Sequence, residues 1–213
     1  MFRSPFKTDF LCCVLLMLCG LLYAGAAAAK PPAILIVGDS ISAGYGMTLD
    51  ESWPRLLQDR LDREGLSYRV VNASITGETT QGGLARLPGL LERHRPEIVV
   101  LELGGNDGLR GLDIRATREN LAMMIRDSQA AGATVLLTGI QLPPNYGERY
   151  TRLFRDLYAE LAEQNGTLLV PFLLEGVALE AGMMQADGIH PSVAAQPVLL
   201  DHVWTALSAV LAP

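Results

Sequence analysis

Short apolar runs alternate along the chain with longer segments in which apolar residues recur at helical spacing. Unbroken apolar runs of this kind are typical of strands that are buried on both faces of a parallel sheet. Their strict alternation with helical segments predicts an α/β fold, a three-layer α/β/α sandwich around a five-stranded parallel sheet. The expected strands cover residues 33–37, 68–72, 98–103, 134–138 and 167–170.

The segments between these strands predict amphipathic helices. In residues 53–64 the apolar side chains form one stripe, and Ser52 is a suitable N-cap. Pro88 lacks a backbone donor, so we expect the segment 81–95 to form two short helices rather than one. Gly132 is a suitable residue to end the next helix. The expected helices cover residues 53–64, 81–95, 117–131, 148–164 and 192–211.

Residues 1–29 have the composition of a secretory signal peptide. Arg3 and Lys7 give a basic start, residues 11–23 form an apolar core, and small residues follow. This core is shorter than the about 20 residues that a membrane helix needs, and an uncleaved anchor is the alternative interpretation. We therefore predict that residues 30–213 form a single domain and that the mature protein is periplasmic or secreted.

The cysteine content and the charge narrow the classes of function. All three cysteines lie in the predicted signal, so the mature chain offers no disulfide, no thiol nucleophile and no cysteine-ligated zinc. The net charge is −6, and it becomes −7 without the signal, which carries two basic residues and one acidic residue. The chain has no basic cluster, which argues against a nucleic-acid partner.

Three polar loops that contain glycine follow the first three expected strands. The tripeptide Gly-Asp-Ser at 38–40 ends the first apolar run, residues 73–80 follow the second run, and residues 104–108 follow the third. Because parallel sheets carry their ligand sites at the carboxyl ends of the strands, we expect these loops at one edge of the sheet. Ser40 is therefore a candidate nucleophile, although Gly, Asp and Ser are also ordinary turn residues.

His190 is the histidine best placed to act as a base. Asp187 lies three residues before it, so its carboxylate can accept a hydrogen bond from the imidazole Nδ1 and leave Nε2 free to take a proton from a serine. Gly188 gives the short link conformational freedom. By contrast, we expect His94 at a solvated helix end and His202 on the surface or at the edge of the core.

Four short blocks rich in glycine and polar residues follow one another along the chain. They are Gly38-Asp39-Ser40-Ile41-Ser42, Gly77, Gly104-Gly105-Asn106-Asp107 and Asp187-Gly188-Ile189-His190. Together they resemble the four blocks of the SGNH (GDSL) hydrolases. The longer runs at 71–74, 84–88, 102–111 and 142–147 are similar to the bacterial branch of multifunctional acyl-CoA thioesterases, proteases and lysophospholipases. The resemblance covers nearly the whole mature chain.

This resemblance implies a flavodoxin-like fold and a serine hydrolase that cleaves carboxylic esters and thioesters of acyl chains through an acyl-enzyme. It implies Ser40 as the nucleophile, His190 as the general base and then acid, and Asp187 as the acid that orients the imidazole. The backbone N–H groups of Ser40 and Gly77 and the side-chain amide of Asn106 would form the oxyanion hole. No cofactor and no metal are implied.

The loop after the fourth expected strand contains candidate substrate-binding residues. Leu142, Pro143 and Tyr146 are expected to flank the same edge of the sheet and to line an acyl groove, and a stiff surface turn is the alternative. The resemblance implies that this loop and the loop with Leu109 shape acyl-chain recognition. The expected partners are a small-molecule acyl ester or thioester and a transient contact with membrane lipid, and we expect a monomer.

Two other classes of function stay open at this stage. One is a metal-dependent phosphoesterase built from Asp39, Asn106, Asp107, Asp187 and His190. It is disfavoured because it offers a single histidine, whereas transition-metal sites commonly use several nitrogen ligands. The other is a non-catalytic ligand-binding protein on the same fold. In the preferred interpretation, Asp39 and Asp107 brace their turns by hydrogen bonds rather than react.

Overall fold

The apolar runs form the predicted sheet in the computed structural model of the chain, which describes residues 30–212. The strand order is β2-β1-β3-β4-β5, and every neighbouring pair is parallel. The predicted strand ends lie within about one residue of the observed ends. The strands are β1 (Ala33–Gly38), β2 (Arg69–Asn72), β3 (Ile98–Glu102), β4 (Thr134–Thr138) and β5 (Leu168–Val170).

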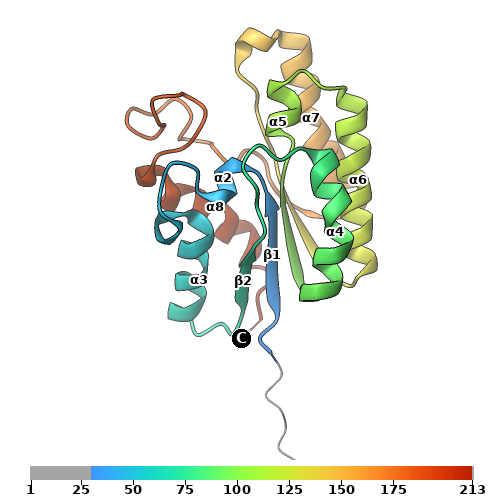
Figure 1. Cartoon of the computed structure of the whole chain (residues 1–213), viewed down its shortest axis with the longest axis vertical. Coiled ribbons are helices and arrows are strands. Elements are labelled where there is room, and N and C mark those ends of the chain that lie inside the picture. The colour runs from blue at the N-terminus through green and yellow to red at the C-terminus, as the bar shows by residue number, and fades with distance from the viewer. Residues whose placement is uncertain (1–29, 213) are drawn as a thin grey trace, which may run out of the picture. The chain divides into compact units, whose positions relative to one another are not determined.

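Helices cover both faces of the sheet, which gives the predicted three-layer fold (Figure 1). On one face, α3 (Trp53–Arg63) packs against α8 (Gln196–Leu207). On the other face, α6 (Ile114–Ala130) packs between α4 (Thr80–His94) and α7 (Glu148–Asn165). The shorter elements are α2 (Ser40–Ala43), α5 (Gly105–Leu109) and the 3₁₀ turns η1 (Leu49–Glu51), η2 (Pro144–Tyr146) and η3 (Val193–Ala195).

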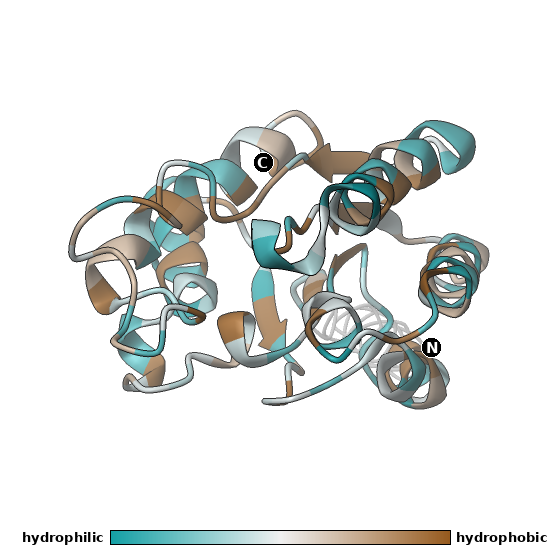
Figure 2. Cartoon of the chain, turned by 90° about the horizontal axis from the view of Figure 1, so that it is seen from above, coloured by the Kyte–Doolittle hydropathy of each residue, from teal (hydrophilic) through white to brown (hydrophobic). Residues whose placement is uncertain are grey.

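Each helix layer encloses its own hydrophobic core against the sheet. Neighbouring residues of a strand point to opposite cores: Leu35 belongs to the core under α4, α6 and α7, and Ile34 to the core under α3 and α8. Every residue of β1 and β3 is buried, which explains why these strands are unbroken apolar runs rather than alternating ones. The helices, by contrast, alternate hydrophilic and hydrophobic segments, as expected when one side faces the sheet (Figure 2).

The position of β1 between β2 and β3 brings the predicted site loops together. Gly38 at the end of β1 pairs in register with Glu102 at the end of β3. All strands run in the same direction, so the loops after β1, β2 and β3 leave from one edge of the sheet. The strand order thus puts Ser40 between the loop with Gly77 and the loop with Asn106.

The prediction that Pro88 divides its segment into two helices is wrong. The structure has one helix, α4, with Pro88 inside it. Gly83, Leu87 and Leu91 follow one another at a spacing of four residues and stay on the buried face across the proline. Pro88 itself is exposed, so its ring does not interrupt the buried face of α4. Packing of the continuous apolar face therefore outweighs the cost of the proline.

Other helix boundaries differ from the prediction in smaller ways. Ser52 is the N-cap of α3 by position, but its hydroxyl donates to the carbonyl of Leu49 instead of capping the helix. The last helix begins at Gln196 and ends at Leu207, and is therefore shorter than the predicted segment 192–211. In the part of the chain that the structure describes, no helix is both long and apolar enough to cross a membrane. The predicted signal peptide lies outside the described residues.

Candidate active site

Ser40 is the first residue of α2 and follows directly on the turn that ends β1. Asp39 is the N-cap of this short helix, and its Oδ1 accepts a hydrogen bond from the backbone N–H of Ile41 at 3.0 Å. Ser40 is 8 % exposed, so its hydroxyl lies at the edge of the buried interior rather than free in solvent. The turn therefore holds Ser40 in one position at the carboxyl edge of the sheet.

His190 comes to the same edge on the loop between β5 and η3. The carboxylate of Asp187 accepts hydrogen bonds from the backbone N–H groups of Ile189 (2.9 Å) and His190 (3.0 Å), and its second oxygen lies 2.7 Å from His190 Nδ1. Gly188 has φ +67°, a left-handed conformation that favours glycine and closes this tight turn. Hydrogen bonds from the His190 side chain and backbone lower the pKa of Asp187 to about 2, so this carboxylate is ionised at neutral pH.

The structure brings Ser40, Asp187 and His190 into one chain of contacts. His190 Nε2 lies 2.9 Å from Ser40 Oγ, on the side of the ring opposite to the Asp187 carboxylate. Tyr45, which sequence analysis did not single out, packs on the imidazole with ring centroids 4.2 Å apart. Such an arrangement can transfer the serine proton to the imidazole while the carboxylate stabilises the imidazolium that forms.

Two further loops hold the residues that were predicted to bind an oxyanion. Neither Ser40 N–H nor Gly77 N–H donates to another backbone group among residues 30–212. Gly77 has φ +79°, which a residue with a side chain rarely adopts. Arg110, another residue that sequence analysis missed, donates to the Gly77 carbonyl (3.1 Å) and to Asn106 Oδ1 (3.4 Å) and so connects the two loops.

Two buried acids, Asp39 and Glu102, contact the segment 39–42, which carries Ser40 and is called the serine turn below. Asp39 Oδ2 accepts a hydrogen bond from Asn106 Nδ2 at 3.1 Å, and the second hydrogen of this amide remains available. Burial raises the pKa of Asp39 to about 6, against the lowering effects of the hydrogen bond from Ile41 and of the charge on His190. Burial and the nearby Asp39 also raise the pKa of Glu102 well above its ordinary value. Sequence analysis did not assign a role to Glu102; its signal was an acid at the end of a strand that is otherwise apolar.

Of the predicted substrate-binding residues, Leu142 is buried, whereas Pro143, Tyr146 and Leu109 are more accessible. Leu142 is 8 % exposed and packs against Gly108, where a Cβ atom would lie 2.6 Å from the leucine side chain. It also borders a cavity of about 400 Å³ between the segment 141–144 and α7. The Tyr146 hydroxyl donates to the carbonyl of Leu109 at 2.9 Å and so joins the two predicted recognition loops, while Pro143 is exposed.

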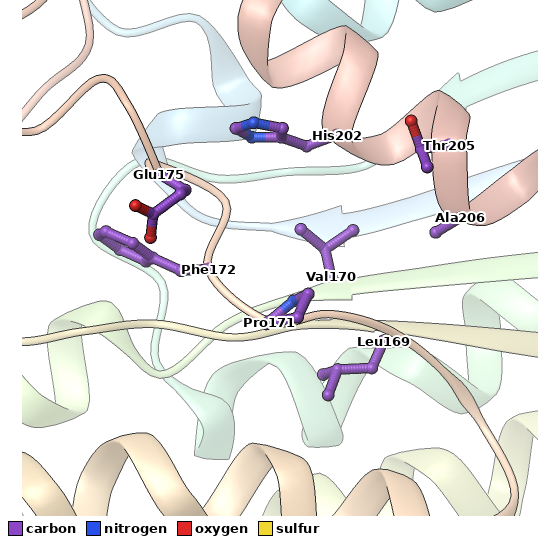
Figure 3. Close-up of a pocket in the computed structure, with 8 residues that line it drawn as sticks. All are labelled: Leu169, Val170, Pro171, Phe172, Glu175, His202, Thr205 and Ala206. Carbon is purple, nitrogen blue, oxygen red and sulfur yellow. The ribbon is translucent and has the colours of Figure 1, made fainter.

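A second cavity, of about 320 Å³, lies between the end of β5 and α8 (Figure 3). Its lining is mostly apolar, with Glu175 and His202 as its ionisable residues. His202 Nδ1 lies 3.0 Å from the carbonyl of Leu173, so this histidine serves the structure at the edge of the core. None of Ser40, Asp187 and His190 lines this cavity.

The remaining candidates have structural surroundings. Asp107 accepts a hydrogen bond from the backbone N–H of Thr80 at 2.9 Å, and so braces the start of α4 rather than its own turn. His94 is the last residue of α4, at a partly exposed helix end. Among residues 30–212, no group of three or more potential ligands among His, Cys, Asp and Glu is arranged to hold a metal ion.

The fold and the contacts of Ser40 are those of a serine hydrolase on a parallel α/β/α sandwich. Residues 36–196 match the model of the GDSL-like lipase/acylhydrolase family, and the chain belongs to this family. The match begins inside β1 and includes Ser40, Gly77, Asn106, Asp187 and His190.

Three similar proteins illustrate the relationship. Esterase TesA of Pseudomonas aeruginosa is 58% identical over 178 residues, which cover 84% of this chain and 89% of that protein. Thioesterase 1/protease 1/lysophospholipase L1 of Escherichia coli K12 is 48% identical over 179 residues, 84% of each chain. The crystal structure of a psychrotrophic esterase, EstA from Pseudoalteromonas, inhibited by monoethylphosphonate, has a TM-score of 0.80 and 41% identity, and the match covers 83% of this chain and 97% of that one.

Proposed function

We propose that this protein hydrolyses carboxylic esters and thioesters of acyl chains through an acyl-enzyme on Ser40. The observation that carries the proposal is the continuous contact from Asp187 through His190 to the Ser40 hydroxyl, with separations of 2.7 and 2.9 Å. A serine needs an adjacent base to become a nucleophile at neutral pH, and an oriented imidazole is the usual one. In this chain the imidazole is that of His190, and its Nδ1 contacts the carboxylate of Asp187.

In the first half of the reaction, Ser40 Oγ attacks the acyl carbonyl carbon while its proton passes to His190 Nε2. The carbonyl oxygen becomes an anion, and its stabilisation falls to the N–H groups of Ser40 and Gly77 and the free N–H of Asn106. His190 then returns the proton to the departing alcohol or thiol, and the carbon–oxygen or carbon–sulfur bond breaks. Asp187 keeps its negative charge throughout and stabilises the imidazolium.

In the second half, water replaces the leaving group. His190 takes a proton from water, the hydroxide attacks the acyl-enzyme carbonyl, and the proton returns to Ser40 Oγ as the carboxylic acid is released. Both halves need only residues of this chain, and we propose that neither a metal nor another cofactor takes part.

The similar proteins support acyl esters as the substrate class. One carries the name esterase and another combines thioesterase with lysophospholipase, so both bond types occur as named activities among relatives of this chain. Leu109 lies on α5, the short helix that also carries Asn106, and an apolar side chain there favours an acyl chain rather than a charged acid as the group transferred to Ser40. We propose that a monomer acts on single lipid or ester molecules, in transient contact with membrane lipid.

The proposed compartment rests on the sequence. A basic start, an apolar core and a run of small residues precede the domain, so we propose that the protein is exported and acts in the periplasm or outside the cell. Cysteines are absent after residue 19, so the mature domain folds there without disulfides.

A labelling experiment tests the proposal directly. A fluorophosphonate should label the purified protein at one residue, Ser40, and should fail to label Ser40→Ala and His190→Ala. Hydrolysis of p-nitrophenyl esters, acyl-CoAs and lysophospholipids, compared by kcat/KM, then ranks the leaving groups and chain lengths. Activity that survives in Ser40→Ala would contradict the mechanism, and activity lost to a chelator would favour the phosphoesterase alternative instead.

A further inference from the structure

The side chain of Glu102 fills a space that exists only because residue 38 is a glycine. Glu102 is fully buried at the end of β3, opposite Gly38 in the sheet register. A Cβ atom on Gly38 would lie 2.8 Å from Glu102 Oε2 and equally close to the Ser42 side chain. Real Cβ atoms do not approach other atoms so closely, so the glycine before Asp39 and Ser40 is what admits this carboxyl group.

One oxygen of Glu102 holds the serine turn at both ends. Oε2 accepts the backbone N–H of Asp39, the residue before Ser40, at 3.3 Å. The same oxygen accepts the hydroxyl of Ser42, two residues after Ser40, at 2.7 Å. Ser40 thus lies in a short segment whose flanking residues are both bonded to one buried atom. A hydroxyl must be positioned to a fraction of an ångström to react well, so this attachment bears on the chemistry.

The other oxygen of Glu102 is buried and has no hydrogen-bond partner among the described residues. An ionised carboxylate without a donor to one oxygen, and without a cation paired to it, is far more costly in the interior than a neutral acid. Asp39 is also buried, and its own oxygens accept from Ile41 and Asn106. Two adjacent buried acids accommodate one negative charge better than two.

We propose that Glu102 is a positioning residue for Ser40, and that it acts in its neutral, protonated form. Its unprotonated oxygen, Oε2, accepts hydrogen bonds from the N–H of Asp39 and the hydroxyl of Ser42. Because Glu102 keeps its proton, Asp39 is the single anion of the pair, and it orients the amide of Asn106. Glu102 touches neither the substrate nor the reacting atoms. This inference rests on the proposed role of Ser40 as the nucleophile.

Three variants of Glu102 and its neighbours separate the parts of this inference. Glu102→Gln keeps the shape and the accepting oxygen without a charge, so kcat should stay within about threefold of the wild type, because the same hydrogen bonds form. Glu102→Leu removes both hydrogen bonds to the turn, and kcat should fall about 100-fold, the loss expected for a small misplacement of a reacting group. Ser42→Ala removes one bond, and kcat should fall about threefold to tenfold.

The readout is the division of the effect between kcat and KM for a p-nitrophenyl ester, together with the rate of fluorophosphonate labelling. KM should stay nearly constant because the Glu102 side chain is buried away from substrate, while kcat and the labelling rate fall together. Thr138→Val is the matched control: it is a buried polar residue on the neighbouring strand β4, and its hydroxyl donates to Leu101. This variant should keep wild-type kinetics.

Each result decides a part of the inference. A Glu102→Gln variant as inactive as Glu102→Leu would show that the charged form is needed and overturn the neutral state. Wild-type kcat in Glu102→Leu would overturn the positioning role. If Glu102→Leu does not fold, Ser42→Ala decides instead, and an unchanged kcat there overturns the role. Ser40→Ala that still hydrolyses the ester would refute the proposed function itself, whatever the Glu102 variants do.

Discussion

Asp187 and Asp39 both belong to the site around Ser40, but their environments are opposite. The side chain of Asp187 is 38% exposed, accepts hydrogen bonds from two backbone N–H groups and the imidazole, and has a pKa lowered to about 2 by them. Asp39 is 2% exposed, lies beside a second buried acid, and has a pKa raised to about 6, chiefly by burial. Asp187 is therefore ionised at any pH near neutral, whereas burial disfavours the ionised form of Asp39. We call the exposed part of the site around Asp187 and His190 the rim, and the buried part around Asp39, Glu102 and Asn106 the floor.

The two regions therefore differ in how much negative charge they carry during the proposed reaction. In the proposed mechanism, the rim supplies a fixed negative charge that balances the imidazolium formed during the reaction. At the floor, a large negative charge would repel the carbonyl oxygen, which becomes an anion during the proposed reaction. Asp39 and Glu102 carry one negative charge rather than two if they share one proton. Variants at the rim and at the floor should therefore differ in what they lose.

The largest effect is expected at the rim. Asp187→Asn keeps the size of the side chain but removes the charge and can hold His190 in the wrong tautomer, so kcat should fall about 10⁴-fold with the fold intact. Steady-state kinetics with a p-nitrophenyl ester measures this. A fall of less than about tenfold would mean that the imidazole is oriented by other contacts.

At the floor of the site, Asn106→Ala removes the one side-chain donor proposed for the oxyanion. We expect kcat to fall about 10²–10³-fold, equivalent to about 2.7–4 kcal/mol of barrier. KM should change little, because the interaction strengthens only in the transition state. A normal kcat in a folded Asn106→Ala protein would remove this residue from the mechanism.

A smaller effect, on stability, should distinguish the two aspartates by its sign. The pKa of Asp39 is about 6 in the folded protein against an ordinary value of 3.8, so its ionisation opposes folding and wild-type stability is lost as pH rises through this window. Between pH 4 and pH 7, the free energy of unfolding of Asp39→Asn should therefore gain about 1–3 kcal/mol relative to the wild type. Urea unfolding at each pH measures the difference.

Asp187→Asn is the control for that measurement, and its trend should be opposite. The folded pKa of Asp187 lies below its ordinary value, so its stabilising contribution is present above about pH 4 and is lost as pH falls towards 2. Because this carboxylate is exposed, the change should be small. Parallel trends for the two variants would contradict the division between rim and floor.

The smallest expected effect concerns Tyr45, which packs on the His190 ring. Aromatic contacts of this kind contribute about 0.5–1.5 kcal/mol, so Tyr45→Ala should lower kcat by about twofold to tenfold. Leu49→Ala is a matched control, since Leu49 is also exposed on the segment after α2 and has no aromatic partner. Equal losses in both variants would indicate a general effect of that segment rather than the stacking on His190.

The elements that could be predicted from sequence are those whose signal is local. The strands of residues 33–38 and 98–102 are buried on both faces, so their apolar runs mark them without knowledge of any neighbour. The pair of Asp187 and His190 is also local, because three residues of chain are enough to bring carboxylate and imidazole together. The position of Ser40 after a buried strand makes it a candidate, and the resemblance to the SGNH hydrolases then assigns it the role of nucleophile.

What could not be predicted depends on contacts between distant segments. Glu102 lies 63 residues from Asp39, and only the register of β1 and β3 shows that its carboxyl group fills the space above Gly38. Arg110 reaches Gly77 across two loops, and nothing in its own segment indicates this. The helix through Pro88 was mispredicted for the same reason, since the decisive apolar contacts come from the sheet and from α6.

Asp187 and His190 share one short loop, while Ser40 begins α2 directly after the end of β1. An antiparallel bridge between Met184 and Pro191 closes that loop at its base, on either side of Asp187 and His190. The contact between Asp187 and His190 lies within the loop, whereas the contact of 2.9 Å between His190 Nε2 and Ser40 Oγ joins the loop to another segment, so a displacement of the loop would change the second contact first. The proposed proton transfer therefore depends on how one loop is seated against the end of β1, and a substitution that shifts this loop should lower kcat even if it leaves Ser40, Asp187 and His190 unchanged.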